Sequence, residues 1–215
     1  MKLSILLALS LTAISAAQYA HAAEEDTSMS FFVTSVGSGK GGDLGGLEGA
    51  DKHCTTLAEA AGVKGKIWHA YLSTQEEGKR GVSARDRIGE GPWHNAKGEL
   101  IASNLDQLHI MPNIVKTTAL DENGELVNGR GDAPNRHDLL TGTMEDGTAY
   151  FPSVTEDRTC SNWTSSDEGS ATLGHHDRHG GGNTSWNSAH GSQGCSMDAL
   201  AKTGGTGLFM CFASK

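Results

Sequence analysis

The sequence predicts an α+β domain that is rich in loops and stabilised by disulfides. Residues that favour β-structure dominate two segments near the ends of the chain, Phe31–Val36 and Gly207–Ala213. Between them, Leu47–Gly62 repeats its apolar residues every three or four positions, which indicates a helix with one buried face. The chain also has 29 glycines, 4 prolines and 4 cysteines. This composition is typical of a globular fold with many turns, rather than of a disordered chain or a helical bundle.

Shorter segments complete the expected order of elements. Ile67–Ser73 is rich in β-forming and bulky residues and predicts a second strand. Ser103–Leu108 predicts a short second helix whose first residue is the N-cap. Lys97-Gly98 and Asn123-Gly124 predict tight turns between strand-like pieces. Beyond position 141 the chain is mostly Gly, Ser, Thr, Asp and His, which predicts long loops of the kind that usually carry function.

The first residues predict a secretory signal peptide. Lys2 supplies the positive charge, the next about 15 residues are apolar, and Ala20-His21-Ala22 places small residues at the cleavage site. The apolar run is shorter than the ~20 residues that cross a bilayer, so we expect no membrane insertion. The expected division is a signal peptide over 1–22, a polar leader over 23–29 and a single domain over 30–215. The protein is expected in the periplasm or outside the cell.

The charge of the chain limits its partners and its chemistry. The formal net charge is −9, so we expect no binding to nucleic acid or other polyanions. The sequence has no Gly-x-Ser-x-Gly motif, and the glycine-rich stretch over 37–46 lacks the ending of a phosphate-binding loop. We therefore expect a protein without enzymatic activity.

The cysteines indicate disulfide bonds rather than a zinc knuckle. Cys54, Cys160, Cys195 and Cys211 form no Cys-x-x-Cys pair. An even number of cysteines in an exported chain predicts two disulfides. The residues alone permit three pairings of the four.

Several motifs together resemble a known fold. His53–Thr74 carries a helical cysteine followed by an Ala-Tyr-Leu-Ser-Thr strand, Arg85-Asp86-Arg87 comes next, and Cys160–Ser165 reads Cys-x-x-Trp-x-Ser. Over most of residues 30–214 the chain resembles the C-type lectin-like fold, most closely the endostatin domain of collagens, and also bacterial exported proteins that are labelled as lectins. The resemblance implies a mixed twisted sheet with two short helices and long loops. It also implies nested disulfides, Cys54 with Cys211 and Cys160 with Cys195.

The chain departs from this family in ways that limit what the resemblance implies. Calcium-dependent lectins carry Glu-Pro-Asn and Trp-Asn-Asp, where this chain has Ala133-Pro134-Asn135 and Trp186-Asn187-Ser188. Each string lacks the carboxylate that a calcium ion requires, so we expect no calcium-dependent sugar site. Heparin binding, which in endostatin depends on arginines, is not expected of an acidic chain.

Histidines concentrate in one segment near the C-terminus and predict a metal site. Neutral imidazole is a good ligand for Zn²⁺, Cu²⁺ or Ni²⁺, and a carboxylate accompanies the histidines. The alternative is a solvated loop in which one histidine supports the loop around Trp186. The candidate metal ligands are His175, His176, Asp177, His179 and His190.

A second polar segment, Asn128–Asp138, predicts a rigid ligand-binding loop because glycine and proline shape its backbone. Its acidic residues would otherwise pair with Arg130 or Arg136 and order the loop. Trp186 lies in another loop, where its ring would stack on a sugar or pack into the core. The candidate ligand-binding residues are Asp132, Asn135, Asp138, Trp186 and Asn187.

These features lead to three functional hypotheses. The first is an exported, non-catalytic, lectin-like module that binds a glycan or another surface ligand through its long loops. The second is a zinc- or copper-binding protein that uses the segment from His175 to His190. The third is a structural or adhesive domain with a protein partner.

Overall fold

The computed structural model describes residues 26–180 and 182–214. The expected signal peptide, residues 1–22, and the first part of the expected leader, residues 23–25, lie outside the described residues. In the described part of the chain, no helix is long and apolar enough to cross a membrane. The chain folds into one larger sheet, two small sheets and a few helices, which confirms the α+β prediction.

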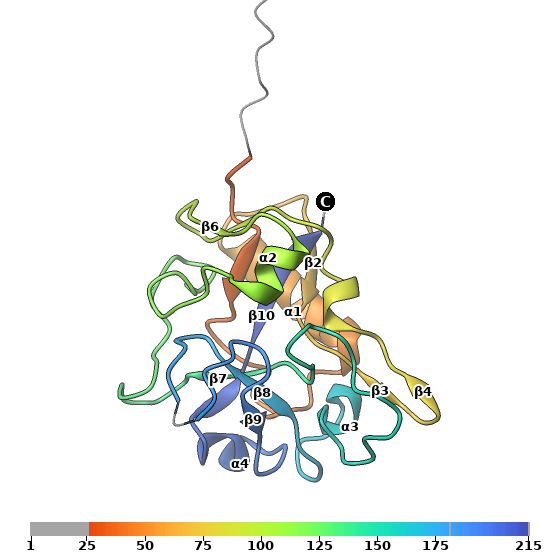
Figure 1. Cartoon of the computed structure of the whole chain (residues 1–215). Helices are drawn as coiled ribbons and strands as arrows, with labels where there is room; N and C mark the ends of the chain where they lie inside the picture. The colour runs from red at the N-terminus through yellow and green to blue at the C-terminus, as the bar shows by residue number, and fades with distance from the viewer. Residues whose placement is uncertain (1–25, 181, 215) are drawn as a thin grey trace, which may run out of the picture.

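The last strand, β10 (Gly205–Ser214), joins the two halves of the main sheet (Figure 1). Its C-terminal half pairs antiparallel with β1 (Phe31–Val33) on one edge and with β2 (Ile67–Ala70) on the other. Its N-terminal half pairs in parallel with β7 (Asp138–Leu140). A single strand of ten residues therefore connects the start, the middle and the end of the chain.

Two more strands extend the sheet beyond β7. Strand β8 (Thr172–His175) pairs antiparallel with β7, and β9 (His190–Gly191) pairs antiparallel with β8. In Figure 1 these strands lie at the end of the molecule opposite the C-terminus. The two small sheets are hairpins, β3 (Gln75–Glu76) with β4 (Lys79–Arg80) and β5 (Trp93–His94) with β6 (Leu100–Ala102).

Helix α1 (Gly46–Ala60) covers one face of the sheet at β2. Its residues Ala50, Cys54 and Ala58 recur every four positions and are fully buried, and their small side chains let the helix lie close to the sheet. The remaining helices are short. They are the 3₁₀ turn η1 (Ala84–Asp86), α2 (Leu105–Ile110), α3 (Cys160–Trp163) and α4 (Met197–Ala201).

The hydrophobic core forms two clusters because both faces of β10 are buried. Phe209 and Cys211 belong to the cluster on the side of α1, whereas Met210 and Phe212 belong to the other cluster. This alternation follows from the two-residue period of a strand. A strand covered on both faces reads as a continuous apolar run, which is what made it recognisable in the sequence.

Two disulfides join distant parts of the chain. Cys54 in α1 bonds to Cys211 in β10 across 157 residues, and Cys160 bonds to Cys195 across 35 residues. All four cysteines are fully buried. The observed pairing is the nested pairing that the family resemblance implied.

Several details of the sequence prediction are corrected. The N-cap of α2 is Asn104 and not Ser103, because the Asn104 side chain accepts the Gln107 N–H. Strand β1 ends at Val33 and not at position 36. The chain turns after Val33, and the backbone N–H of Ser35 donates to the Glu122 carboxylate. Strands β7 to β9 were not predicted because they are short and contain His, Asp or Gly.

We predict that the two disulfides contribute unequally to stability. In the chain-entropy model a disulfide stabilises more when it closes a longer loop. Cys54→Ala/Cys211→Ala should therefore lower the free energy of unfolding by about 1 kcal/mol more than Cys160→Ala/Cys195→Ala does. Urea unfolding of both variants and the parent measures this difference, and a larger loss from the shorter loop would contradict it.

Candidate functional site

Three neighbouring strands place polar side chains on one face of the sheet. Asp138 in β7 lies directly opposite His175 in β8. His190 in β9 lies opposite Leu173, two residues before His175, and so it shares the same face. Directly opposed residues of antiparallel strands hold their side chains within contact distance. The strand register alone therefore brings a carboxylate and two imidazoles together.

His137 adds a third imidazole from the residue before β7. Its ring stacks on that of His175 with centroids 4.4 Å apart and an angle of 15° between the planes. Gly204, with φ +106, passes so close that a Cβ at this position would lie 2.9 Å from the His137 ring. Glycine is favoured here because its backbone adopts the positive φ and leaves room for the imidazole.

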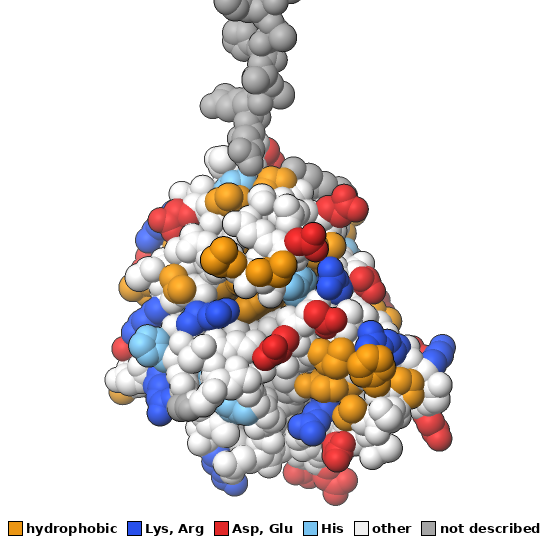
Figure 2. Space-filling model, in the orientation of Figure 1, with side chains coloured by type: hydrophobic (Ala, Val, Ile, Leu, Met, Phe, Trp, Pro, Cys, Tyr) orange, Lys and Arg blue, Asp and Glu red, His pale blue; other side chains and the backbone are white. Residues whose placement is uncertain are grey.

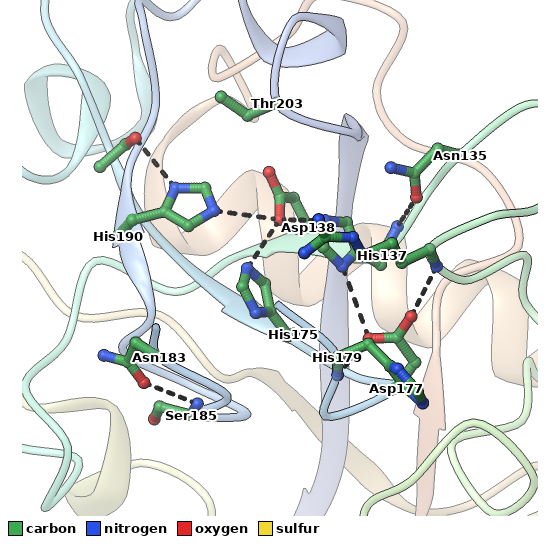
Figure 3. A network of polar contacts seen from close by, with 12 residues as sticks. Asn135, His137, Asp138, His175, Asp177, His179, Asn183, Ser185, His190 and Thr203 are labelled. Carbon is green, nitrogen blue, oxygen red and sulfur yellow. Dashed lines mark hydrogen bonds and ion pairs between the residues drawn. The ribbon is translucent and has the colours of Figure 1, made fainter. Parts of the chain in front are cut away.

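The three imidazoles converge on one oxygen atom, Asp138 Oδ1 (Figure 3). The Nε2 atoms of His137 and His175 each lie 3.2 Å from this oxygen, and His190 Nε2 lies 3.5 Å from it. One ligand atom each of His137, Asp138 and His175 lies within 4.8 Å of the others. We call His137, Asp138, His175 and His190 the histidine cluster.

The inner part of the cluster is buried and its polar atoms are poorly satisfied. His137, Asp138 and His175 are 4%, 1% and 2% exposed. Both carboxylate oxygens of Asp138 and both ring nitrogens of His175 lack a hydrogen bond of acceptable geometry. Most buried polar atoms in proteins have such a partner. Four exceptions in adjacent residues therefore mark a place where an ion or a water molecule would complete the bonding.

Groups outside the cluster orient two of its imidazoles. His137 Nδ1 lies 3.5 Å from Asp177 Oδ1, which turns Nε2 of the same ring towards Asp138. Asp177 is itself fixed by the backbone N–H groups of Arg130, at 2.6 Å, and His179, at 3.0 Å. His190 Nδ1 lies 3.1 Å from the carbonyl oxygen of the following residue. A carboxylate or carbonyl behind an imidazole is the usual outer partner of a metal-binding histidine.

The charges in the cluster stabilise one another. Burial alone would raise the pKa of Asp138, but the contacts from His175 and His190 outweigh it and lower this pKa to about 2. Burial also opposes ionisation of Asp177, yet His137 and two backbone N–H groups hold its pKa well below the usual range. The contact with Asp138 raises the pKa of His190. Both carboxylates are therefore ionised at neutral pH.

A cavity of about 540 Å³ opens over the imidazoles of the cluster. His137, His175 and His190 border it on one side. The other lining residues are Arg130, Asn135, Gly180, Gly182, Asn183, Ala189 and Thr203. Several polar side chains therefore face the cavity, and its volume is in the range of small-molecule sites.

The structure brings together only part of the predicted metal set. His175 and His190 belong to the histidine cluster, and Asp177 lies behind it. His176 is fully buried and contacts the Asn128 carbonyl oxygen at 3.2 Å, and His179 is exposed. His137 was missed, because its sequence neighbours gave no sign that position 137 folds against position 175.

The predicted ligand-binding residues are also dispersed. Asp138 lies at the centre of the cluster, and Asn135 lines the cavity and accepts the His137 N–H at 3.2 Å. Asp132 is paired with Lys116 at 2.5 Å. The two remaining residues, Trp186 and Asn187, are buried at 2% and 1% exposure.

The packing of Trp186 and Asn187 gives both a structural role, and their contact with a ligand stays a prediction. The Trp186 ring packs against Tyr71 with centroids 4.8 Å apart and against His109 at 5.9 Å. The Asn187 amide donates to the Tyr71 hydroxyl at 3.0 Å and to the Glu145 carbonyl at 3.0 Å. Both side chains therefore support the core behind the cavity.

Another cavity, of about 470 Å³, lies between the β3–β4 hairpin and the segment over 150–162. Figure 2 shows hydrophobic side chains gathered near this hairpin. Phe151 at its edge is 54% exposed, but the Arg80 guanidinium lies 3.8 Å above the ring centroid and covers one face. The polar groups that line this cavity are already hydrogen-bonded to one another. The Asn162 side-chain amide accepts the Gln75 N–H and donates to the Gln75 carbonyl oxygen. This cavity offers no unpaired group comparable to those of the histidine cluster.

Comparisons with known proteins assign no family to the chain. No protein-family model matches the sequence, and no curated protein matches it. The resemblance to the C-type lectin-like fold therefore depends on the motifs and the disulfide pattern alone. Functional inference has to begin from the geometry of the histidine cluster.

Proposed function

We propose that this protein binds a divalent transition-metal ion, with zinc as the best fit, through the histidine cluster. The observation that carries the proposal is the approach of three imidazole nitrogens to one buried carboxylate oxygen at 3.2, 3.2 and 3.5 Å. The protein ligands would be Nε2 of His137 and His175 and Oδ1 of Asp138, the three residues whose ligand atoms lie within 4.8 Å of one another, with His190 beside them at the edge of the cavity. This is the second of the three hypotheses drawn from the sequence, with a revised set of ligands.

Two of the distances have the size that a tetrahedral ion requires. Zinc binds imidazole nitrogen and carboxylate oxygen at about 2.0–2.1 Å, so neighbouring ligand atoms of a tetrahedron lie about 3.3–3.4 Å apart. The Nε2 atoms of His137 and His175 each lie 3.2 Å from Asp138 Oδ1, close to this value. The outer contact of His137 supports the same ligand atom, because it leaves Nε2 turned inward. The fourth position of the tetrahedron is left to a ligand from outside the chain.

The types of ligand select the class of metal. Imidazole ligands suit zinc and copper, whereas calcium requires six to eight oxygen ligands. A single carboxylate among the ligands therefore favours a transition metal over calcium. Its negative charge would partly neutralise a divalent ion in a buried place, which lowers the cost of removing the ion from water.

A bound ion would join two strands and the segment before β7. Its ligands come from β7, β8 and His137, a part of the sheet that pairs with β10 only through β7. An ion that binds only the folded chain stabilises that chain by mass action. The ion would therefore order the long loops that follow each of these strands.

The C-type lectin-like identity of the fold and the export of the protein are part of the same proposal. The bond from a helix to the last strand, with a second bond nested within it, supports this fold. Glycan or surface-protein binding remains a prediction. Trp186 is a weak aromatic contact for such a ligand, because only 2% of this residue is exposed.

We predict that the purified protein binds one zinc ion and that His137→Ala or His175→Ala abolishes this stoichiometric binding. Free zinc at 100 times the Kd should stabilise the parent by about 2.7 kcal/mol. His179→Ala is the matched control, because this exposed histidine belonged to the sequence-based set but lies outside the cluster. Elemental analysis and thermal melting check the expectation. Loss of zinc in the His179 variant, with retention in the other two, would refute the proposed ligands.

We predict that Asp177→Asn weakens zinc binding by about 10- to 100-fold and leaves the stoichiometry at one. The carboxylate orients His137 without being a ligand, so its loss frees the imidazole but removes no ligand atom. Asp167→Asn changes an exposed carboxylate outside the cavity and serves as the control. Competition against a zinc chelator measures both affinities, and equal affinities would show that Asp177 does not position His137.

We predict opposite pH dependences without and with metal. In EDTA, His190 stabilises the fold because its folded-state pKa is raised above 6.5. The contribution of His190 to the free energy of unfolding is fully present below pH 6.5 and is lost as the pH rises through the folded-state pKa. The stability difference between the parent and His190→Gln should therefore shrink from pH 5 to pH 8. Zinc competes with protons, so stabilisation by zinc should grow over the same range. Denaturant unfolding at each pH measures both trends.

A further inference from the structure

We propose that the cavity over the histidine cluster binds a carboxylate-bearing ligand, with one oxygen on the metal ion and the other held by Arg130. This inference depends on the proposed metal site and names the ligand class that the same site would take. The carboxylate could belong to a small free acid or to a uronic acid residue of a glycan.

The first argument is the position of the cavity relative to the proposed ligands. The three imidazoles line the cavity, but Asp138 does not, because it lies beneath them at 1% exposure. A bound ion would therefore have its protein carboxylate on the buried side and the solvent-filled cavity on the other. The His190 side chain is 37% exposed, so one edge of the cluster is accessible from the cavity. A zinc site with three protein ligands keeps its fourth position for water or another ligand.

The second argument is the charge around the cavity. The chain has 26 acidic residues and a net charge of −9, and Figure 2 shows acidic side chains distributed over the face it draws. Among the described residues, however, no Asp or Glu lines this cavity, and Arg130 supplies a full positive charge. A divalent ion would add positive charge on the side of the cavity, because Asp138 lies beneath the imidazoles and the second ionised carboxylate, Asp177, lies behind His137. The cavity therefore favours an anion, although the protein as a whole repels anions.

The third argument is that the backbone of Arg130 is held in place while its exposed guanidinium has no hydrogen-bond or ion-pair partner among the described residues. Its backbone N–H donates to Asp177 Oδ2 at 2.6 Å, and the neighbouring Asp132 is tied to Lys116. Gly129 passes so close to Asp177 that a Cβ there would lie 2.6 Å from Oδ2. No carboxylate of the described residues pairs with the Arg130 side chain, whereas Asp132 is already paired. Arginine binds carboxylates through two parallel hydrogen bonds, which makes a carboxylate a fitting partner.

The fourth argument is that Asn135 offers an uncharged hydrogen-bond donor in the same cavity. Asn135 lines the cavity, and its Oδ1 accepts the His137 N–H at 3.2 Å. Its Nδ2 donates to no described residue and is available to a ligand oxygen. An amide donor and a guanidinium beside a metal ion suit an oxygen-rich anion, and the volume of about 540 Å³ suits one of small size.

The test is calorimetric titration of the zinc-loaded protein with galacturonate, acetate, galactose and inorganic phosphate. Zinc content is measured first. Galacturonate and acetate should bind the zinc-loaded protein and not the EDTA-treated protein, and neutral galactose should bind neither. Tighter binding of galacturonate than of acetate indicates a glycan source, and equal binding indicates a small free acid. Arg130→Gln should weaken carboxylate binding about tenfold or more with unchanged zinc content. Arg80→Gln, which changes an arginine at the other cavity, should have no effect.

The outcomes separate this proposal from the metal site on which it depends. If the parent protein takes up no zinc, both proposals fail. If zinc binds at one equivalent but the carboxylates do not, only the carboxylate proposal is overturned. It is also overturned if galactose binds as well as galacturonate, if phosphate binds more tightly than either carboxylate, or if zinc removal or Arg130→Gln leaves binding unchanged.

Discussion

The pairing of β7 with both β10 and β8 is the interaction on which the rest of the structure depends. Strand β10 carries Cys211 and contributes to both hydrophobic clusters, and β7 is the strand that connects it to the outer part of the sheet. The register of β7 with β8 sets Asp138 opposite His175. A shift by one residue would turn Asp138 to the other face. The same pairing therefore determines the packing of the core and the composition of the histidine cluster.

The cluster places charged and polar groups where a hydrophobic core would otherwise continue. Leu140 and Leu173, two residues away along the same strands, belong to the cluster of buried apolar residues next to α1. Burying an ionised carboxylate beside three imidazoles costs free energy unless the group has partners. A metal ion would provide them. The proposed carboxylate ligand would add a further partner on the solvent side, because the imidazoles and Arg130 line the cavity while Asp138 lies beneath them.

The sequence predicted the local features and missed those that depend on strand pairing. The apolar periods of α1 and β10 and the presence of two disulfides could be recognised from nearby residues, and the family resemblance supplied the disulfide pairing. His175 and His190 were predicted as ligands because histidines concentrate there. His137 was missed because its role depends on the β7–β8 register, which no local pattern indicates. Trp186 was assigned to a ligand because its loop is polar, and its burial against Tyr71 is equally non-local.

X-ray absorption spectroscopy at the zinc edge of the loaded protein tests the central claim most directly. We predict one ion surrounded by nitrogen and oxygen at about 2.0–2.1 Å, with the scattering pattern of coordinated imidazole and no sulfur ligand. His179→Ala should leave this spectrum unchanged, whereas His175→Ala should lose it. An ion surrounded by oxygen ligands alone, or an unchanged spectrum in His175→Ala, would contradict the histidine cluster as the binding site.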